Sequence, residues 1–265
     1  MAKVVSFHAH PDDESIQTGG TLAKLAAAGH RTILVFATKG EQGEVADGFL
    51  DDGETLGQRR EKEVAASAAI LGVARVAYLG YHDSGMMGTP ENDDPESFWQ
   101  ADVEEASERL ATILREEGAD VLTAYDSDGG YGHPDHIQVH RVGLRAAELA
   151  GTPRFFEATM NRDHLRRLIE ATRAEGTMPD DEVPDVDEGS TFGRPESVIT
   201  TSVDVTDFVQ QKRASMEAHA SQITDEHFFM KMPDDAFAAA FGYEWFIRHG
   251  VPDGHRDDDL LAGLA

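Results

Sequence analysis

The chain has 265 residues, of which 50 are acidic and 23 basic, giving a formal net charge of −27. Nucleic acids and anionic membranes need a basic patch, so we expect neither as a partner. The absence of cysteine excludes disulfides and thiolate ligands, which leaves histidine and carboxylates for any metal. The acidity either keeps the protein in solution or reflects adaptation to high salt, and the sequence does not decide between them.

A hydrophobic fraction of 40% is enough for one folded α/β domain. The N-terminal sequence MAKVVSFHAH holds an apolar run too short for a signal peptide, and no run approaches the roughly 18 residues of a membrane span. We therefore expect a cytoplasmic protein. The oligomeric state is open, and a homo-oligomer is compatible with the sequence.

Short apolar runs alternate with helical patterns along the chain. Buried strands are predicted at 4–7, 32–37, 73–79, 121–124 and 154–158, with a further strand at 198–203. Helices are predicted at 16–28, 58–71, 103–117, 135–150, 164–174 and 205–220. Gly29, Gly72 and Gly118 stand at C-cap positions, and Pro134 can open a helix. This alternation predicts a mainly parallel, Rossmann-like α/β sheet flanked by helices, with a smaller C-terminal extension.

Composition divides the chain into four segments. Residues 1–175 form the expected α/β core, and 176–197 form an acidic, proline-containing linker or lid that we expect to be mobile. Residues 198–252 complete the same domain, and 253–265 are expected to be a disordered tail. The long acidic loops 38–55 and 80–98 follow the second and third strands, at the sheet edge where open α/β folds bind ligands.

Two clusters of histidine and acid follow the first and fourth predicted strands. The first, HAHPDDE at 8–14, holds three consecutive acids, which repel one another and need a cation or strong hydrogen bonds. A single acid there would be explained by helix capping. The second, DSDGGYGHPDHIQVH at 126–140, has glycines that let the backbone approach a ligand. A turn with solvated histidines explains the second cluster alone, but two clusters at equivalent strand ends predict a metal site.

These paired motifs resemble those of the PIG-L/LmbE-type zinc-dependent N-deacetylases. The resemblance runs from about residue 4 to 223 and includes HDSGM at 82–86 and AHASQI at 218–223. It is closest to the actinobacterial branch that deacetylates N-acetylglucosaminyl-inositol in mycothiol synthesis or cleaves mycothiol conjugates. The resemblance implies a hydrolase that releases acetate and a free amine from a small acetylated aminosugar. The motifs are specific for the family and less so for the substrate.

The resemblance also implies which residues hold the metal. His10, Asp13 and His136 would bind one Zn²⁺ per chain, and Asp12 would be the general base. Three protein ligands leave one zinc position open for water, as a catalytic site requires, and zinc lowers the pKa of that water toward about 7. Histidine and aspartate ligands also admit iron, manganese or cobalt.

Further residues are assigned to the substrate by the same resemblance. Tyr131 and His133 would assist the developing oxyanion or the leaving group. Arg60 and Asp83 would hold polar groups of the substrate, and His219 would border the pocket.

Other residues of these motifs have simpler interpretations. His140 follows the second cluster on the same helical face and is an alternative ligand, although a supporting or surface role is commoner. Glu14 is expected to orient its turn or cap the next helix, and His8 to be structural. Ser6 and Ser84 have no evident base in the sequence, which argues against a serine nucleophile.

Two other functions compete with deacetylation. Amidases acting on mycothiol conjugates typically carry a lysine in the turn after HPDDE, where this chain has SIQT at 15–18, and this favours the deacetylase. A catalytically inactive sugar-binding relative would lack the base or a ligand, and none is missing here.

Overall fold

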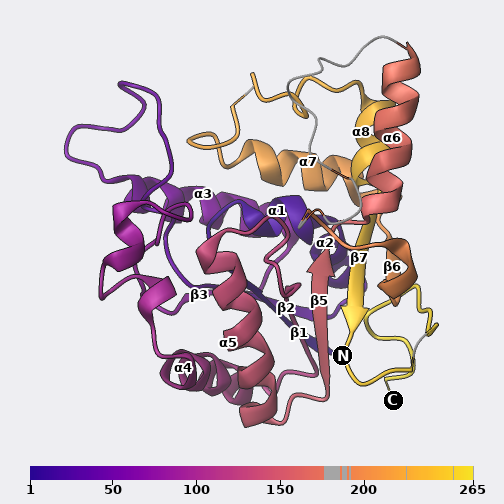
Figure 1. Cartoon of the computed structure of the whole chain (residues 1–265), viewed down its shortest axis with the longest axis horizontal. Coiled ribbons are helices and arrows are strands. Elements are labelled where there is room, and N and C mark those ends of the chain that lie inside the picture. The colour runs from indigo at the N-terminus through magenta and orange to yellow at the C-terminus, as the bar shows by residue number, and fades with distance from the viewer. Residues whose placement is uncertain (176–185, 187–189, 191, 225, 253, 265) are drawn as a thin grey trace.

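A computed structural model (Figure 1) describes all residues except 176–185, 187–189, 191, 225, 253 and 265. Within the described residues the strands are β1 (Lys3–His8), β2 (Arg31–Phe36), β3 (Arg75–Tyr78), β4 (Val121–Tyr125), β5 (Arg154–Thr159), β6 (Thr201–Asp204) and β7 (Tyr243–Arg248). They form one sheet in the order β3-β2-β1-β4-β5-β7-β6. β1 to β5 run parallel, and β7 is antiparallel to β5 and β6. The predicted α/β class with a mainly parallel sheet is confirmed.

Helices cover both faces of this sheet (Figure 1). They are α1 (Asp13–Gln17), α2 (Gly19–Ala27), α3 (Leu56–Leu71), α4 (Val103–Glu117), α5 (Pro134–Ala150), α6 (Arg162–Glu175), α7 (Val209–Glu217) and α8 (Asp234–Phe241). α4 packs against α5, while α2, α3 and α7 pack together. No helix of the described chain is long and apolar enough to cross a membrane.

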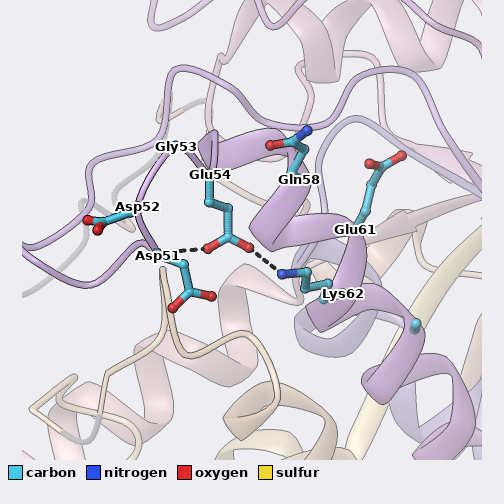
Figure 2. Close-up of a pocket in the computed structure, with 8 residues that line it drawn as sticks. Asp51, Asp52, Gly53, Glu54, Gln58, Glu61 and Lys62 are labelled. Atoms are coloured by element: carbon cyan, nitrogen blue, oxygen red, sulfur yellow. Dashed lines mark hydrogen bonds and ion pairs between the residues drawn. The ribbon is translucent and has the colours of Figure 1, made fainter.

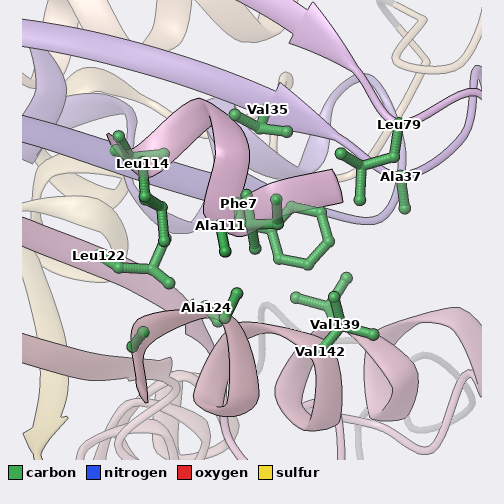
Figure 3. Packing of buried hydrophobic residues seen from close by; sticks show 14 of the residues in the cluster. Phe7, Val35, Ala37, Leu79, Ala111, Leu114, Leu122, Ala124, Val139 and Val142 are labelled. Atoms are coloured by element: carbon green, nitrogen blue, oxygen red, sulfur yellow. The ribbon is translucent and has the colours of Figure 1, made fainter. Parts of the chain in front are cut away.

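The two faces of the strands build separate cores. Phe7 and Val35 point to the α4 and α5 side (Figure 3), whereas Leu34 and Phe36 point to α2 and α3. This alternation follows from the two-residue period of a strand, and each fully buried side chain of this kind stabilises the fold by about 1.5–3 kcal/mol. Helix side chains completing the first core include Ala111, Leu114, Val139 and Val142.

The predicted helix at 16–28 is two helices, α1 and α2, interrupted at Thr18. The Glu244 carboxylate from β7 accepts hydrogen bonds from the backbone N–H groups of Gly20 and Thr21, each at 2.8 Å, and so satisfies the start of α2. A side chain at Gly20 would also meet Val205 at 2.6 Å. Contacts with residues more than 180 positions away therefore set this break, and local pattern does not show them.

The C-terminal part differs most from expectation. β7 and α8 were not predicted, and the predicted strand at 198–203 is a 3₁₀ turn (Glu196–Val198) followed by β6. The predicted helix at 205–220 is a 3₁₀ turn (Thr206–Phe208) followed by α7. The described residues of the expected disordered tail, 254–264, instead pack on the sheet: Leu260 is buried, and its carbonyl accepts from Arg154 Nη1 at 2.9 Å. Most of the expected lid at 176–197 lies outside the described residues.

The sheet order places a topological switch between β1 and β4. From β1 the chain moves outward to β2 and β3, and from β4 it moves the other way to β5. Adjacent connections that diverge in this way leave a crevice at the carboxyl ends of the two strands. HAHPDDE follows β1 and the 126–140 motif follows β4, so both clusters lie at this switch.

Candidate active site

Three side-chain atoms converge at the switch point. Asp13 Oδ2 lies 3.5 Å from His10 Nδ1 and 3.3 Å from His136 Nε2. The opposite nitrogen of each ring is held by an acceptor: His136 Nδ1 donates to the Gly129 carbonyl at 3.1 Å, and His10 Nε2 donates to Asp135 at 3.1 Å. In their neutral forms both rings therefore point a bare lone pair at the Asp13 carboxylate.

Three acceptors facing one another fit a bound cation. Ligand atoms of a tetrahedral zinc at roughly 2.0–2.1 Å are about 3.3–3.4 Å apart, close to the two separations at Asp13. Burial opposes protonation of His10, but nearby carboxylates, Asp83 foremost, raise its pKa well above its ordinary value. Burial would raise the pKa of Asp13, but His136 and His10 lower it well below its ordinary value. Positive charge is thus favoured here, whether proton or metal.

Two overlapping groups of possible ligands share His10. One adds His133 and His136, and the other adds Asp83 and Asp135. Asp135 is occupied on both oxygens, by Ser84 and by the His10 ring, which suits a residue that orients a metal ligand. His133 Nδ1 accepts from the Asp135 backbone N–H at 3.1 Å, and in the neutral ring the proton then sits on Nε2, which leaves no free lone pair for a metal.

Asp12 is held in an unusual backbone conformation beside this cluster. Its φ of 103° is the only positive value at a non-glycine residue of the described chain. Such strain is retained only where surrounding contacts enforce it, often at functional sites. Arg60 supplies them: its Nη2 lies 3.1 Å from Asp12 Oδ2 and also donates to the Pro11 carbonyl. Burial raises the Asp12 pKa to about 6, with Arg60 opposing the rise. A carboxylate of that pKa suits a general base near neutral pH.

Glu14 holds the backbone of Asp12 in place. Its Oε2 accepts from the Asp12 backbone N–H at 2.9 Å, and its Oε1 accepts from Ser67 at 2.6 Å and Ser15 at 3.0 Å. The ring of His219 lies 2.7 Å from the same Oε1, and both residues are fully buried. His219 therefore contacts Glu14, which in turn holds Asp12, and it is closed off from solvent. Glu14 orients its turn, as the sequence suggested.

His133 and Tyr131 flank the cluster on the other side. The His133 ring centroid lies 4.7 Å from that of His10 and 5.2 Å from that of His136. Burial, with the charge of His10, lowers the His133 pKa to about 3, so the ring is neutral. Because its Nδ1 accepts from the backbone, its Nε2 carries the proton and is a donor. The Tyr131 hydroxyl lies 3.5 Å from His136 Nε2, and the residue as a whole is 43% exposed.

The residues predicted to bind substrate are placed unequally. Asp83 Oδ1 lies 3.5 Å from His10 Nε2, within the cluster, and its oxygens accept from the backbone of Gly85 and Gln42. Arg60 is only 3% exposed and its guanidinium is directed at the loops around Asp12. Asp83 is thus at the site, whereas Arg60 lies behind it, as His219 does.

Three buried polar residues, Asp135, Tyr125 and Ser84, were missed or underused by sequence reasoning. Asp135 was overlooked, although its place between two histidines in HPDH was a usable signal. Tyr125 Oη accepts from the Ala9 backbone N–H at 3.1 Å and lies 3.0 Å from His8 Nδ1, which fixes the end of β1. Ser84 donates to Asp135. Nothing in the sequence distinguishes Tyr125 and Ser84 from ordinary core or loop residues.

His140, the alternative ligand, points away from the cluster. Its Nδ1 donates to the Tyr125 carbonyl at 3.1 Å and lies 3.5 Å from Glu157 Oε1. Glu157 also contacts His249 at 2.6 Å. His140 therefore belongs to a separate contact between α5 and β5.

A surface hollow lies elsewhere, over the start of α3 (Figure 2). Glu54 is its centre: it accepts from Lys62 Nζ at 2.7 Å and from the Asp51 backbone N–H at 3.1 Å. The hollow is open and acidic, and none of the predicted site residues lines it. Its contacts fasten the end of the 38–55 loop to α3.

Comparison with known proteins identifies the family of this chain. The family model described as "PIG-L: GlcNAc-PI de-N-acetylase" matches residues 5–147. The 1D-myo-inositol 2-acetamido-2-deoxy-alpha-D-glucopyranoside deacetylase of Acidothermus cellulolyticus is 43% identical, over 100% of this chain and 96% of its own length. The enzyme of the same name from Nocardiopsis dassonvillei is 42% identical, over 97% of this chain and 99% of its own length.

Solved structures show the same fold. N,N'-diacetylchitobiose deacetylase from Pyrococcus horikoshii superposes with a TM-score of 0.61 at 24% identity, over 93% of this chain and 83% of that one. At this identity the likeness concerns the fold alone. The family match and the full-length relatives together show that this chain belongs to the PIG-L family.

Proposed function

We propose that this protein is a zinc-dependent N-deacetylase that hydrolyses the acetamide of 1D-myo-inositol 2-acetamido-2-deoxy-α-D-glucopyranoside, releasing acetate and a free amine. The full-length relatives carry that activity in their names. The observation that carries the proposal is the Asp12 carboxylate, held on a backbone with positive φ, beside three converging acceptor atoms. A partly buried base next to a cation site is the arrangement that metal-assisted amide hydrolysis requires.

The proposed metal ligands are His10, Asp13 and His136. A bound zinc ion would supply Lewis acidity, acidifying a water molecule and polarising the acetyl carbonyl. The hydrogen bonds from His10 to Asp135 and from His136 to Gly129 fix both rings with their free lone pairs toward Asp13.

Asp12 is proposed to carry the proton. With a pKa raised to about 6, it is mostly ionised at neutral pH and can accept a proton from the attacking water. As the C–N bond breaks, the same carboxyl group can return that proton to the departing nitrogen. Arg60 and Glu14 hold it in place, so we propose Arg60 as a positioning residue.

His133 and Tyr131 are proposed to stabilise the oxyanion. Neutral His133 presents an Nε2 donor, and its lowered pKa argues against a role as the proton source for the amine. Burial also raises the Tyr131 pKa, so its hydroxyl keeps a proton to donate. A single well-placed donor of this kind contributes about 10²–10³ in rate.

The substrate itself fits the charge of the protein. An acetylated glucosaminyl-inositol is uncharged, so a net charge of −27 does not repel it. Asp83 lies at the site with acceptor oxygens, and we propose that it binds a sugar hydroxyl. His219 is proposed to act through Glu14, because it is fully buried.

Acetate release from this substrate tests the proposal. We expect release by the purified protein, loss of release after chelation, and recovery on adding Zn²⁺. A mycothiol S-conjugate serves as the control substrate and should be cleaved more slowly. Faster cleavage of the conjugate would favour the amidase, and no release by metal-loaded protein would contradict the proposal.

A further inference from the structure

Tyr131 stands on a glycine-rich loop, residues 126–132, whose internal hydrogen bonds run from backbone N–H groups to Asp126 and Asp128. Gly129, Gly130 and Gly132 all have positive φ, at 64°, 76° and 91°, which favours glycine and gives the chain freedom. Tyr131 is 43% exposed as a residue, yet its hydroxyl reaches within 3.5 Å of His136 Nε2. A contact from outside the loop would help to keep this side chain in one position.

Arg194 provides such a contact from a distant part of the chain. Its Nη1 lies 3.0 Å from Asp128 Oδ2, and its Nη2 donates to Ser127 Oγ at 2.5 Å and lies 3.8 Å from Asp126 Oδ1. The guanidinium thus reaches three successive residues at the start of the Tyr131 loop. Asp126 is itself fixed, because its Oδ2 accepts from Thr159 on β5 at 2.6 Å.

The backbone around Arg194 is hydrogen-bonded both to the segment that follows β5 and to the Tyr131 loop. Arg194 N donates to the Met160 carbonyl at 2.8 Å, and its own carbonyl accepts from the Arg162 backbone N–H at 2.9 Å. Gly193 N donates to the Gly130 carbonyl at 3.0 Å, one residue before Tyr131. A side chain at Gly193 would meet the Met160 carbonyl oxygen at 2.6 Å, so this close approach requires glycine.

We propose that Arg194 is a positioning residue that holds the Tyr131 loop, and so sets the place of the Tyr131 hydroxyl during catalysis. The inference rests on the proposed function, in which Tyr131 stabilises the transition state. Arg194 touches neither substrate nor metal in this account. It acts through Asp128 and Ser127, and its loss frees the two acidic residues, Asp126 and Asp128, that accept the hydrogen bonds within the loop.

A double-mutant cycle with Tyr131→Phe tests the coupling. Arg194→Ala should lower kcat by at least about tenfold with little change in KM or bound zinc, because small displacements of a catalytic group cost up to about a hundredfold. In the Tyr131→Phe background the same change should alter kcat by less than about twofold. Arg194→Lys should recover part of the loss.

Arg167→Ala is the matched control, because Arg167 pairs with Glu196 at 2.9 Å on the nearby surface and does not reach the loop. It should leave kcat unchanged. An unchanged kcat in Arg194→Ala, or an equal loss with and without Tyr131, would overturn the proposal. If Arg194→Ala does not fold, Asp128→Asn removes the other half of the pair and should show the same coupling.

Hydrogen exchange separates this proposal from the proposed function. In Arg194→Ala the amides of Gly129, Gly130 and Gly132 should exchange at least about tenfold faster than in wild type or Arg167→Ala. This readout needs no substrate, so it stands even if wild-type protein releases no acetate. Unchanged exchange in that loop would show that Arg194 does not hold it, whatever the activity of the enzyme.

Discussion

Replacing Glu14 by Gln should destabilise the fold strongly, although the two side chains have the same shape. Glu14 Oε1 accepts from Ser67, Ser15 and His219, while Oε2 accepts from the Asp12 backbone. An amide has one acceptor oxygen, so its NH₂ must face a donor on one side. The change also leaves His219 buried without its counter-charge.

The expected cost follows from burial. Both members of the pair are fully buried and 2.7 Å apart, and removing one partner of such a pair costs about 3–5 kcal/mol. At about 2–4 °C per kcal/mol for a chain of this size, the lower figure predicts a Tm drop of about 6–12 °C. Glu104→Gln is the control, since Glu104 is 61% exposed and pairs with Arg145 at the surface. That control should change stability by less than about 1 kcal/mol.

The pH dependence of this loss has a defined sign. Burial would raise the Glu14 pKa, but the contact with His219 outweighs burial and lowers the pKa to about 2. The stability that ionised Glu14 contributes is therefore fully present above about pH 4.5 and is lost as the pH falls toward 2. Burial would lower the His219 pKa, but Glu14 raises it above 6.5. The stability that protonated His219 contributes is therefore fully present below about pH 6.5 and is lost as the pH rises through the raised pKa. The difference in Tm between wild type and Glu14→Gln should therefore be largest between about pH 4.5 and 6.5. Thermal unfolding that matches Glu104→Gln at every pH would refute the reasoning.

Two further predictions concern the ligand loop and the surface charge. Gly129→Ala should weaken zinc retention in dialysis and lower Tm, because a Cβ there would meet His136 Cβ at 2.5 Å. Gly151→Ala is the control: Gly151 has a similar φ of 67° with open space around it, so this change measures the conformational cost alone. Equal zinc retention in both variants would contradict the assignment of His136 as a zinc ligand. Raising KCl from 0.1 to 1 M should increase Tm, because the Debye length falls from about 10 to about 3 Å and a net charge of −27 repels itself less. A Tm that falls with KCl would show that ion pairs outweigh this repulsion.

The sequence was most informative where chemistry is concentrated locally. The strands β1 to β5 and the two motifs follow from apolar runs and residue spacing, and the predicted family and fold class are confirmed. The motifs follow the carboxyl ends of β1 and β4, and the parallel pairing of these strands brings the segments that carry His10 and His136 to the same edge of the sheet.

Long-range contacts account for most of what was missed. β7 pairs with β5 across about 90 residues and its Glu244 divides α1 from α2, which no local pattern encodes. His219 was expected to border the pocket. Its ring instead hydrogen-bonds to Glu14, a residue 205 positions away that also holds the Asp12 backbone. Arg60 has a clear helical position, yet only the structure shows that its guanidinium turns to Asp12.

The central claim is that adjacent carboxylates divide two tasks, with Asp13 on the metal and Asp12 on the proton. Zinc content and acetate release measured together on Asp12→Asn and Asp13→Asn test it most directly, since asparagine tolerates the positive φ at Asp12. We expect Asp12→Asn to keep one zinc per chain and lose about 10²–10⁴ in turnover, and Asp13→Asn to lose zinc. Zinc lost from Asp12→Asn and kept in Asp13→Asn, or full activity in both, would contradict the account.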